Sequence, residues 1–341
     1  MLKRRTMIII LSLASLLVPA ALAQAKPEIG IQDEDVFVSG KSTLGPTQGY
    51  QRLAELSVHR MRILVTSDSV ETPGGGFDFR QYDRAVNQAA QNGVRVQFTL
   101  VGQHPRPNVR DFARFAAATA DHFRGRVDRY GIWNEPNYIA WLKPLNRAPA
   151  LYRKLYAAGY KAIKTNDASA KVLIGETVPY AQGRRAMAPV KFLRKVACVN
   201  AQYHRVRRCT KLKADGYAHH PYDFEKAPRR SIRGKDDATI GSLRNLTRAL
   251  DKIAHTGQIR GTKKLYLTEY GYLATGRRGL SERKRASYLK QGLRIARKNR
   301  RVKEVIQYLL VQPSNGSPFT TGIVSPNGTP LPSFAVLRAA A

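Results

Sequence analysis

Several residue types are scarce in this 341-residue sequence, and each scarcity excludes a class of protein. Two cysteines cannot by themselves provide a four-ligand zinc site, which argues against a zinc-finger protein. The 26 glycines and 18 prolines are scattered rather than periodic, so a collagen-like or low-complexity chain is excluded. Beyond the amino terminus, no apolar run is long enough to span a bilayer. What remains is a chain with 43% hydrophobic residues, enough for a sizeable folded core.

Acidic residues are also scarce: 24 Asp and Glu stand against 58 Lys and Arg, for a net charge of +34. The positive residues are spread over nearly every predicted helix, with clusters at residues 205–208, 229–235 and 277–284. A nucleic-acid-binding surface would concentrate the charge and interleave exposed aromatics, so the pattern argues against nucleic acid as a partner. The pattern is consistent with adhesion to polyanionic cell-wall material or acidic polysaccharide. A compositional bias toward arginine, without a specific partner, explains it equally well.

The amino terminus has the pattern of a secretory signal peptide, residues 1–23. Lys3, Arg4 and Arg5 precede an apolar stretch at residues 7–18, and the small-residue site Ala21-Leu22-Ala23 follows. Cleavage after Ala23 removes three positive charges and no negative one, which leaves +31 on residues 24–341. The alternative is an uncleaved anchor, because the uncharged stretch before Lys26 is just long enough to span a membrane. The pattern therefore predicts a secreted, extracellular protein whose mature chain has no membrane span.

Export changes the interpretation of the two cysteines, Cys198 and Cys209. In an oxidising compartment an isolated pair usually forms a disulfide, so we expect a bond that closes a basic loop before a predicted strand. Two free buried thiols are the alternative. A catalytic cysteine is not expected, because neither residue lies in a nucleophile motif.

Short apolar segments rich in β-branched residues alternate with longer segments of helical periodicity. The alternation predicts strands at residues 28–32, 60–65, 94–100, 129–133, 171–175, 215–219, 264–268 and 304–310. Eight strand-then-helix units in a chain of this length predict an α/β fold, a single-domain (β/α)8 TIM barrel over residues 24–341. A doubly wound sheet has the same alternation but normally carries a Gly-rich turn after its first strand, where this chain has Asp33-Glu34-Asp35.

Three of the helical segments have a clear apolar face. The predicted buried positions are Leu151, Leu155, Ala158 and Ala162 in one helix, then Ala286, Leu289, Leu293 and Ala296 after an N-cap at Ser281, and Phe112, Phe115, Ala116 and Thr119 after Asp111.

In a (β/α)8 barrel the chemistry belongs at the carboxyl ends of the strands. Glu135 follows the fourth predicted strand and Glu269 follows the seventh, although acidic residues are scarce in this chain. A glutamate at the end of a buried strand needs an explanation, because unpaired Glu is almost never fully buried. Two carboxyl groups at one end of a barrel suit glycoside hydrolysis, in which one stays protonated to donate to the leaving oxygen and the other stays ionised.

These residues resemble the motifs of the clan A glycoside hydrolases. The segment Trp133-Asn134-Glu135-Pro136-Asn137 at the end of the fourth strand, with Glu269 at the end of the seventh, is similar to secreted barrels of families 5 and 39. The likeness extends over essentially the whole mature chain, through residues 77–83, 160–164 and 327–330. It implies a retaining O-glycosyl hydrolase that needs no cofactor.

The resemblance also implies roles for individual residues. Glu135 would be the acid/base, Glu269 the nucleophile, and Asn134 would hydrogen-bond the sugar 2-hydroxyl. Arg62 would lie beside Glu269 and keep it ionised. In the structural alternatives, Glu135 caps the following helix, and Glu269 is a buried partner of Arg62 with no chemistry.

His220 and Tyr222 are two residues apart, so on a strand they face the same way, whereas His219 faces the opposite way. We expect His220 and Tyr222 to line the site and orient the carboxylates, with the tyrosine hydroxyl donating to the nucleophile. An ordinary hydrogen-bonded histidine and a packed tyrosine are the alternatives. Because adjacent strand residues diverge, the His219-His220 pair is not expected to bind a metal.

The chain departs from the family pattern in one respect. These enzymes usually have a tryptophan at the end of the eighth strand, beneath the sugar, whereas this chain has only Trp133 and Trp141. Tyr308 and Gln312 are the candidates to replace it. Trp141 falls in a post-strand loop, where it could stack on a sugar ring or simply pack.

The sequence therefore predicts a secreted retaining glycoside hydrolase acting on a β-linked polysaccharide or oligosaccharide by double displacement. Two alternatives stay open: a catalytically idle barrel that binds polysaccharide, and a basic cell-surface adhesion protein in which the carboxylates are structural.

Overall fold

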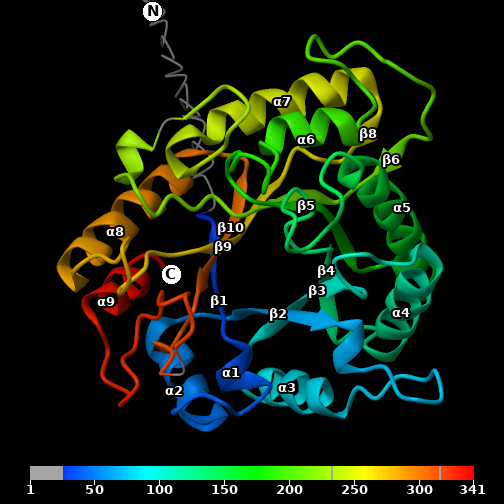
Figure 1. Cartoon of the computed structure of the whole chain (residues 1–341). Helices are drawn as coiled ribbons and strands as arrows, with labels where there is room; N and C mark the ends of the chain where they lie inside the picture. The colour runs from blue at the N-terminus through cyan, green and yellow to red at the C-terminus, as the bar shows by residue number, and fades with distance from the viewer. Residues whose placement is uncertain (1–25, 232, 315) are drawn as a thin grey trace, which may run out of the picture.

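The protein, in a computed structural model, is a closed barrel of eight parallel strands surrounded by helices (Figure 1). The structure describes residues 26–231, 233–314 and 316–341, so the predicted signal peptide lies outside the described residues. Around the barrel the strands run in the order β1-β10-β9-β7-β5-β4-β3-β2, and every neighbouring pair is parallel. The closed parallel sheet confirms the (β/α)8 prediction and excludes the doubly wound sheet.

The eight predicted strands are all present, and their ends differ from the predicted ones by at most two residues. They are β1 (Glu28–Gln32), β2 (Arg60–Thr66), β3 (Arg95–Val101), β4 (Val127–Ile132), β5 (Lys171–Thr177), β7 (Gly216–His219), β9 (Leu265–Tyr270) and β10 (Val302–Tyr308). Two further short strands, β6 (Leu212–Lys213) and β8 (Ile259–Arg260), pair with each other outside the barrel. The sixth, seventh and eighth barrel strands are thus β7, β9 and β10.

Helices follow the barrel strands and cover the outside of the sheet (Figure 1). They are α1 (Glu34–Phe37), α2 (Pro46–Leu56), α3 (Arg80–Gln91), α4 (Val109–His122), α5 (Ala148–Asn166), α6 (Pro189–Val196), α7 (Leu243–Thr256), α8 (Glu282–Lys298) and α9 (Pro332–Arg338). The predicted faces of α4 and α8 are confirmed, since the apolar residues named for them are buried. In the part of the chain that the structure describes, no helix is long and apolar enough to cross a membrane.

The predicted apolar face of α5 is confirmed only in part, since Leu151 and Ala162 pack against the core but are partly exposed. Of its four predicted positions only Leu155 is buried, and the face turned to the barrel carries Tyr152, Tyr156 and Ile163 instead. The two tyrosines are buried with their hydroxyls hydrogen-bonded: Tyr152 accepts from the backbone N–H of Gly175 at 2.7 Å, and Tyr156 donates to the carbonyl of Lys213 at 2.8 Å. A sequence pattern that counts only aliphatic residues misses a face built from tyrosine rings.

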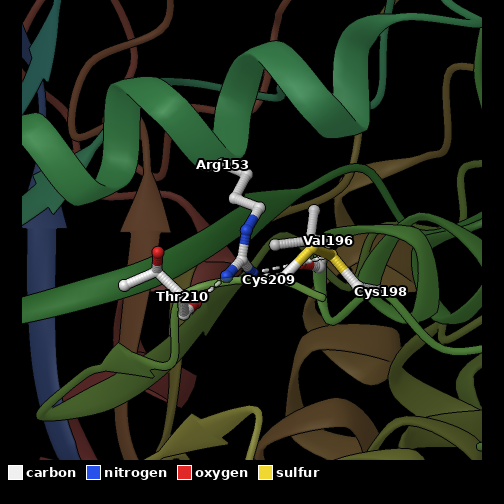
Figure 2. The surroundings of a disulfide bond; sticks show 5 residues. All are labelled: Arg153, Val196, Cys198, Cys209 and Thr210. Carbon is white, nitrogen blue, oxygen red and sulfur yellow. Dashed lines mark hydrogen bonds between the residues drawn. A yellow bond between two sulfur atoms is a disulfide. The ribbon is translucent and has the colours of Figure 1, made fainter. Parts of the chain in front are cut away.

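The predicted disulfide is confirmed: Cys198 and Cys209 are bonded, with their Cα atoms 6.5 Å apart. It closes the loop that leads from α6 toward β6, and Arg153 of α5 reaches the same loop (Figure 2). The guanidinium of Arg153 donates to the carbonyl of Val196 at 2.6 Å and to that of Thr210. The bond and the arginine together fix a loop on the outside of the barrel, close to α5.

Candidate active site

The carboxyl ends of four strands bring the predicted polar residues into direct contact. Arg62 of β2 donates to Glu269 Oε1 of β9 at 2.8 Å, and the hydroxyl of Tyr222 donates to Glu269 Oε2 at 3.1 Å. His220, immediately after β7, lies with its Nδ1 3.0 Å from Oε1 of Glu135, which follows β4. These contacts join residues that are far apart in the sequence into one buried cluster.

The two carboxyl groups lie close together and are partly accessible. One carboxylate oxygen of Glu135, one of Glu269 and a ring nitrogen of His220 all lie within 4.8 Å of one another. The side chains of Glu135 and Glu269 keep 16% and 11% of their surface exposed, whereas Arg62 and His220 are fully buried. A ligand can therefore reach the two carboxyl groups, whereas Arg62 and His220 are buried beneath them.

Just after β4 the backbone is in the left-handed conformation at two residues. Trp133 and Glu135 have φ angles of 68° and 42°, in the left-handed region that side-chain-bearing residues rarely adopt. The turn is held by two backbone bonds, from Trp133 N–H to the carbonyl of Leu100 at 2.8 Å and from Glu135 N–H to that of Glu176 at 2.9 Å. The next helix, α5, begins only at Ala148, so Glu135 is not a helix cap. Strained backbone of this kind clusters at functional sites, where surrounding contacts maintain it.

A hydrogen bond from Arg62 orients the side chain of Asn134. The guanidinium donates to Asn134 Oδ1 at 3.1 Å, and its Nε donates to the hydroxyl of Thr99 at 2.9 Å. Because the amide oxygen of Asn134 is occupied, its NH2 group is the part left to donate to a ligand. Arg62 thus holds both a carboxylate and an amide in fixed positions.

The adjacent histidines have opposite environments. Burial would lower the pKa of His220, but the carboxylates of Glu269, Glu135 and Glu176 outweigh burial and raise it to about 9. His219 points the other way, where its Nδ1 lies 2.9 Å from the Thr177 hydroxyl, and burial lowers its pKa to about 3. These shifts favour an imidazolium at His220 in the cluster and a neutral imidazole at His219 outside it.

Glu135 is placed to keep a proton. Burial raises the pKa of Glu135, and the neighbouring His220 opposes that rise. A carboxyl with a raised pKa can serve as a general acid near neutral pH, and its partner across the gap, Glu269, is bound by a cation and a hydroxyl.

Among the described residues, Glu135, His220 and Glu269 are close enough together to be considered as cation ligands. The chemistry of His220 does not fit that use. Its Nδ1 faces Glu135 and its Nε2 lies 3.0 Å from Glu176 Oε2, so both ring nitrogens face carboxylates. A protonated imidazole has no lone pair to offer a metal.

One central residue was not predicted from the sequence. Glu176, in β5, lies at the bottom of the cluster with its side chain 1% exposed, and it contacts both Arg62 and His220. The signal that pointed to Glu135 and Glu269 was also present here, since Glu176 follows the apolar run Val172-Leu173-Ile174-Gly175. It was not predicted because its importance comes from a left-handed backbone conformation and from buried partners on other strands, which the sequence pattern does not show.

The aromatic residues around the site differ from the expectation. Trp141 lies in the loop after β4, where its ring stacks on that of His104 with centroids 5.0 Å apart. Tyr308 stands at the end of β10, in the position where the family pattern has tryptophan, and packs edge-on against Phe319 with centroids 5.8 Å apart. Gln312 accepts a hydrogen bond from the backbone N–H of Gly322, so of the two proposed substitutes Tyr308 is the one at the strand end.

No family model matches this chain, and no curated protein matches it either. Solved structures do. A family 39 glycoside hydrolase from Bacteroides cellulosilyticus WH2 aligns over 93% of this chain with a TM-score of 0.69 and 17% identity, and this chain spans 64% of its length. A glucosidase from Croceicoccus marinus aligns over 92% with a TM-score of 0.68 and 15% identity, spanning 67% of that chain.

A third match is xylanase 10B from Thermotoga petrophila RKU-1, solved in complex with xylobiose. It aligns over 92% of this chain and 94% of its own length, with a TM-score of 0.62 and 15% identity. At these identities the matches establish architecture and not activity. The chain has the (β/α)8 fold that these glycoside hydrolases share.

Proposed function

We propose that the protein is a retaining glycoside hydrolase with Glu269 as nucleophile and Glu135 as acid/base. The observation that carries the proposal is the distance between the two carboxyl groups, whose nearest oxygens lie within 4.8 Å. Retaining enzymes hold these groups about 5–5.5 Å apart, whereas inverting enzymes leave about 6.5–9.5 Å for a water molecule. A spacing of this size favours the retaining mechanism.

The first step forms a covalent bond to Glu269. Its carboxylate attacks the anomeric carbon as Glu135 donates its proton to the leaving oxygen, so the glycosidic C–O bond breaks and the leaving group departs as an alcohol. Arg62 and Tyr222 orient the attacking carboxylate, since each donates to one of its oxygens. The NH2 group of Asn134 would donate to the sugar 2-hydroxyl, a contact that strengthens in the transition state.

The second step releases the sugar. Glu135, now ionised, removes a proton from a water molecule, which attacks the anomeric carbon and frees Glu269. Because each step inverts the configuration, the product retains that of the substrate. Both steps use side chains that the structure brings together at one end of the barrel.

The proposed substrate is a β-linked polysaccharide or oligosaccharide. Structural neighbours with the same fold include enzymes solved with xylobiose and with mannotriose, which supports a carbohydrate substrate for this chain as well. Tyr308 would form the floor under the sugar in place of tryptophan, because it stands at the end of β10 and its side chain is only partly buried.

Export and adhesion form a separate part of the proposal. The signal pattern at residues 1–23 and the disulfide between Cys198 and Cys209 both suit an extracellular protein. The positive charge of the mature chain suits retention on polyanionic cell-wall material, with compositional bias as the competing explanation.

A nucleophile-rescue experiment tests the assignment of the two glutamates. Purified protein is first screened against aryl β-glycosides and polysaccharides. In Glu135→Ala, a substrate with a good leaving group should still form the glycosyl-enzyme, which then stalls for want of a base. Azide needs no deprotonation, so it should restore turnover and yield a β-glycosyl azide.

The reciprocal variant supplies the control. With Glu269→Ala, azide can only replace the missing nucleophile, so any product should be the inverted α-azide. An α-azide from Glu135→Ala would show that the two roles are reversed. Carbohydrate binding without turnover would favour the idle barrel, and no carbohydrate binding at all would favour the adhesion protein.

A further inference from the structure

The cluster contains a third carboxylate for which the double displacement has no role. Glu176 Oε2 accepts from the hydroxyl of Thr268 at 2.5 Å and lies 3.0 Å from His220 Nε2 and 3.4 Å from Arg62 Nη2. Its other oxygen accepts from the hydroxyl of Thr99 at 3.2 Å. A side chain that accepts from this many donors and is 1% exposed is a specific part of the site.

The surrounding backbone is shaped to admit Glu176. Its φ angle is 50°, in the left-handed region, and its carbonyl accepts the hydrogen bond from Glu135 N–H at 2.9 Å. On the neighbouring strand β4, a Cβ atom on Gly131 would lie 2.2 Å from Glu176 Oε1, so any other residue there would displace the carboxylate. Strain at such a residue persists only where the surroundings impose it.

The direction of the hydrogen bonds follows from the charge of Glu176. Burial would raise the pKa of this carboxyl, but Arg62 and His220 outweigh burial and lower it, so Glu176 is ionised and only accepts. His220 therefore carries a proton on Nε2. If the ring were neutral, its Nδ1 would be an acceptor and would take a hydrogen bond from the protonated carboxyl of Glu135.

We propose that Glu176 is a positioning residue that keeps His220 doubly protonated, so that His220 donates to Glu135 Oε1 and the acidic proton of Glu135 is left on Oε2 to meet the leaving group. The inference rests on the proposed function, because it assigns Glu135 as the acid. Without Glu176, Glu135 would direct its proton at the imidazole and lose it for the reaction.

The charges in the cluster balance only when Glu176 is counted. Before the reaction, Glu176 and Glu269 are negative, Arg62 and His220 are positive, and Glu135 is neutral. In the glycosyl-enzyme, Glu269 is an uncharged ester and Glu135 has become negative, so the sum stays at zero. A buried site that keeps the same net charge through both steps avoids the cost of an uncompensated buried charge.

The groups that face His220 from each neighbouring element determine its titration. They are Glu135 after β4, Glu176 in β5 and Glu269 in β9, with Tyr222 edge-on to the ring and His219 adjacent to it in the chain. Arg62 of β2 pairs with two of these carboxylates, Glu176 and Glu269. Among the residues that the structure describes, Glu176 is the hydrogen-bond partner of Nε2, on the side of the ring away from Glu135.

Titration of His220 by NMR tests the proposal by a readout that does not depend on turnover. The His220 signal is assigned from its loss in His220→Asn, and in the wild-type protein the ring should stay protonated at pH 7.5. In Glu176→Gln, which keeps the size of the side chain, the midpoint should fall by at least about one pH unit. A wild-type His220 that is neutral at pH 7, or a midpoint that Glu176→Gln leaves unchanged, would overturn the proposal.

Kinetics distinguishes a positioning role from a merely structural one. In Glu176→Gln, kcat/KM should fall by roughly 100-fold for aryl glycosides with poor leaving groups, which need protonation, and by less than about tenfold for good ones. The alkaline limb of the pH profile should move to lower pH. Equal losses for both substrates would overturn the proposal, because they would mean that Glu176 does not act through the acid.

Glu34 supplies the matched control. It is a further glutamate at the carboxyl end of the barrel, and its carboxylate accepts from Leu64 N–H at 2.7 Å and from Gln32 Nε2 at 2.8 Å. Burial raises the pKa of Glu34, and the Glu34 carboxylate interacts electrostatically with Arg62. Glu34→Gln should leave the His220 titration and the leaving-group dependence as in the wild type. Complete lack of turnover by the wild-type protein, with His220 still protonated, would count against the proposed hydrolase and not against the charge of the ring.

Discussion

The barrel interior has a cluster of buried charge at each end, and the two clusters are built differently. Arg60 and Arg62 are two residues apart on β2 and both point inward, one toward the amino ends of the strands and one toward the carboxyl ends. At the amino end, Arg60 lies 3.3 Å from Glu28, and Arg129 pairs with the fully buried Glu304. At the carboxyl end the cations are Arg62 and His220.

The difference lies in which cations can lose a proton. A guanidinium stays charged throughout the accessible pH range, so Arg60 and Arg129 are fixed counter-ions for carboxylates that only hold strands together. Replacing one such cation with histidine, and leaving two carboxyls partly exposed, turns a structural ion cluster into one that can store and release protons. The comparison shows that the reactive end is distinguished by His220, a cation that can lose its proton, and not by buried charge alone.

The largest effect should separate the two ends by activity. Glu269→Ala should lower kcat by roughly 10⁴-fold or more, because no group is left to form the glycosyl-enzyme. Its free energy of unfolding should stay within about 2 kcal/mol of the wild type, since Glu269 is at the accessible edge of its cluster. Steady-state kinetics and denaturant unfolding on the same preparation measure both quantities.

The opposite result is expected at the amino end. Arg129→Met removes the nearer of the two cations paired with the buried Glu304 and leaves Arg60 at 3.8 Å, which should reduce the free energy of unfolding by up to about 3–5 kcal/mol. Turnover per folded molecule should be unchanged, because the substitution lies at the far end of the barrel from Glu135. A large loss of kcat in Arg129→Met, with an unchanged free energy of unfolding, would contradict the proposed difference between the two ends.

A smaller effect should appear in the pH dependence of stability. The folded-state pKa of His220, about 9, lies above the ordinary value of about 6.5, so its stabilising contribution is complete below pH 6.5 and is lost as pH rises toward 9. His219 has the opposite shift, to about 3, so its contribution is present above pH 6.5 and is lost as pH falls toward 3.

Unfolding measured from pH 3 to pH 9 in His219→Asn and His220→Asn should separate the two. The alkaline loss should shrink only in His220→Asn, and part of the acid loss only in His219→Asn. Identical pH profiles for the two variants would contradict the opposite environments.

The smallest effect should be the response of the interior to salt. Between 50 and 300 mM salt, hydrolysis of a neutral aryl glycoside should change by less than about twofold, because buried charges are little screened. Retention on a polyanion such as heparin should weaken steeply over the same range if the positive surface serves adhesion. Retention that ignores salt would leave compositional bias as the better explanation of the charge.

Much of the site could be predicted because its signals are local. Glu135 and Glu269 follow strands whose apolar character is visible in a few consecutive residues, and Arg62 lies within such a strand. The spacing of His220 and Tyr222 predicted that they face the same way, and the structure places both against the carboxylates. These inferences need only strand periodicity and the rule that parallel strands end at one rim.

The parts that failed depend on neighbours distant in the sequence. The face of α5 is set by where Tyr152 and Tyr156 find hydrogen-bond partners on other elements, which helical periodicity does not encode. Glu176 was missed because its importance comes from a left-handed backbone conformation and from the space that Gly131 leaves on the next strand.

The sequence by itself determined the eight-strand alternation, the disulfide pair and the two carboxylates at one rim, because each is encoded in short segments of the chain. The tertiary structure alone decided which residues contact His220 and so whether that ring carries a charge. Protonation depends on the distances between groups on different strands, and those distances exist only after the barrel has closed.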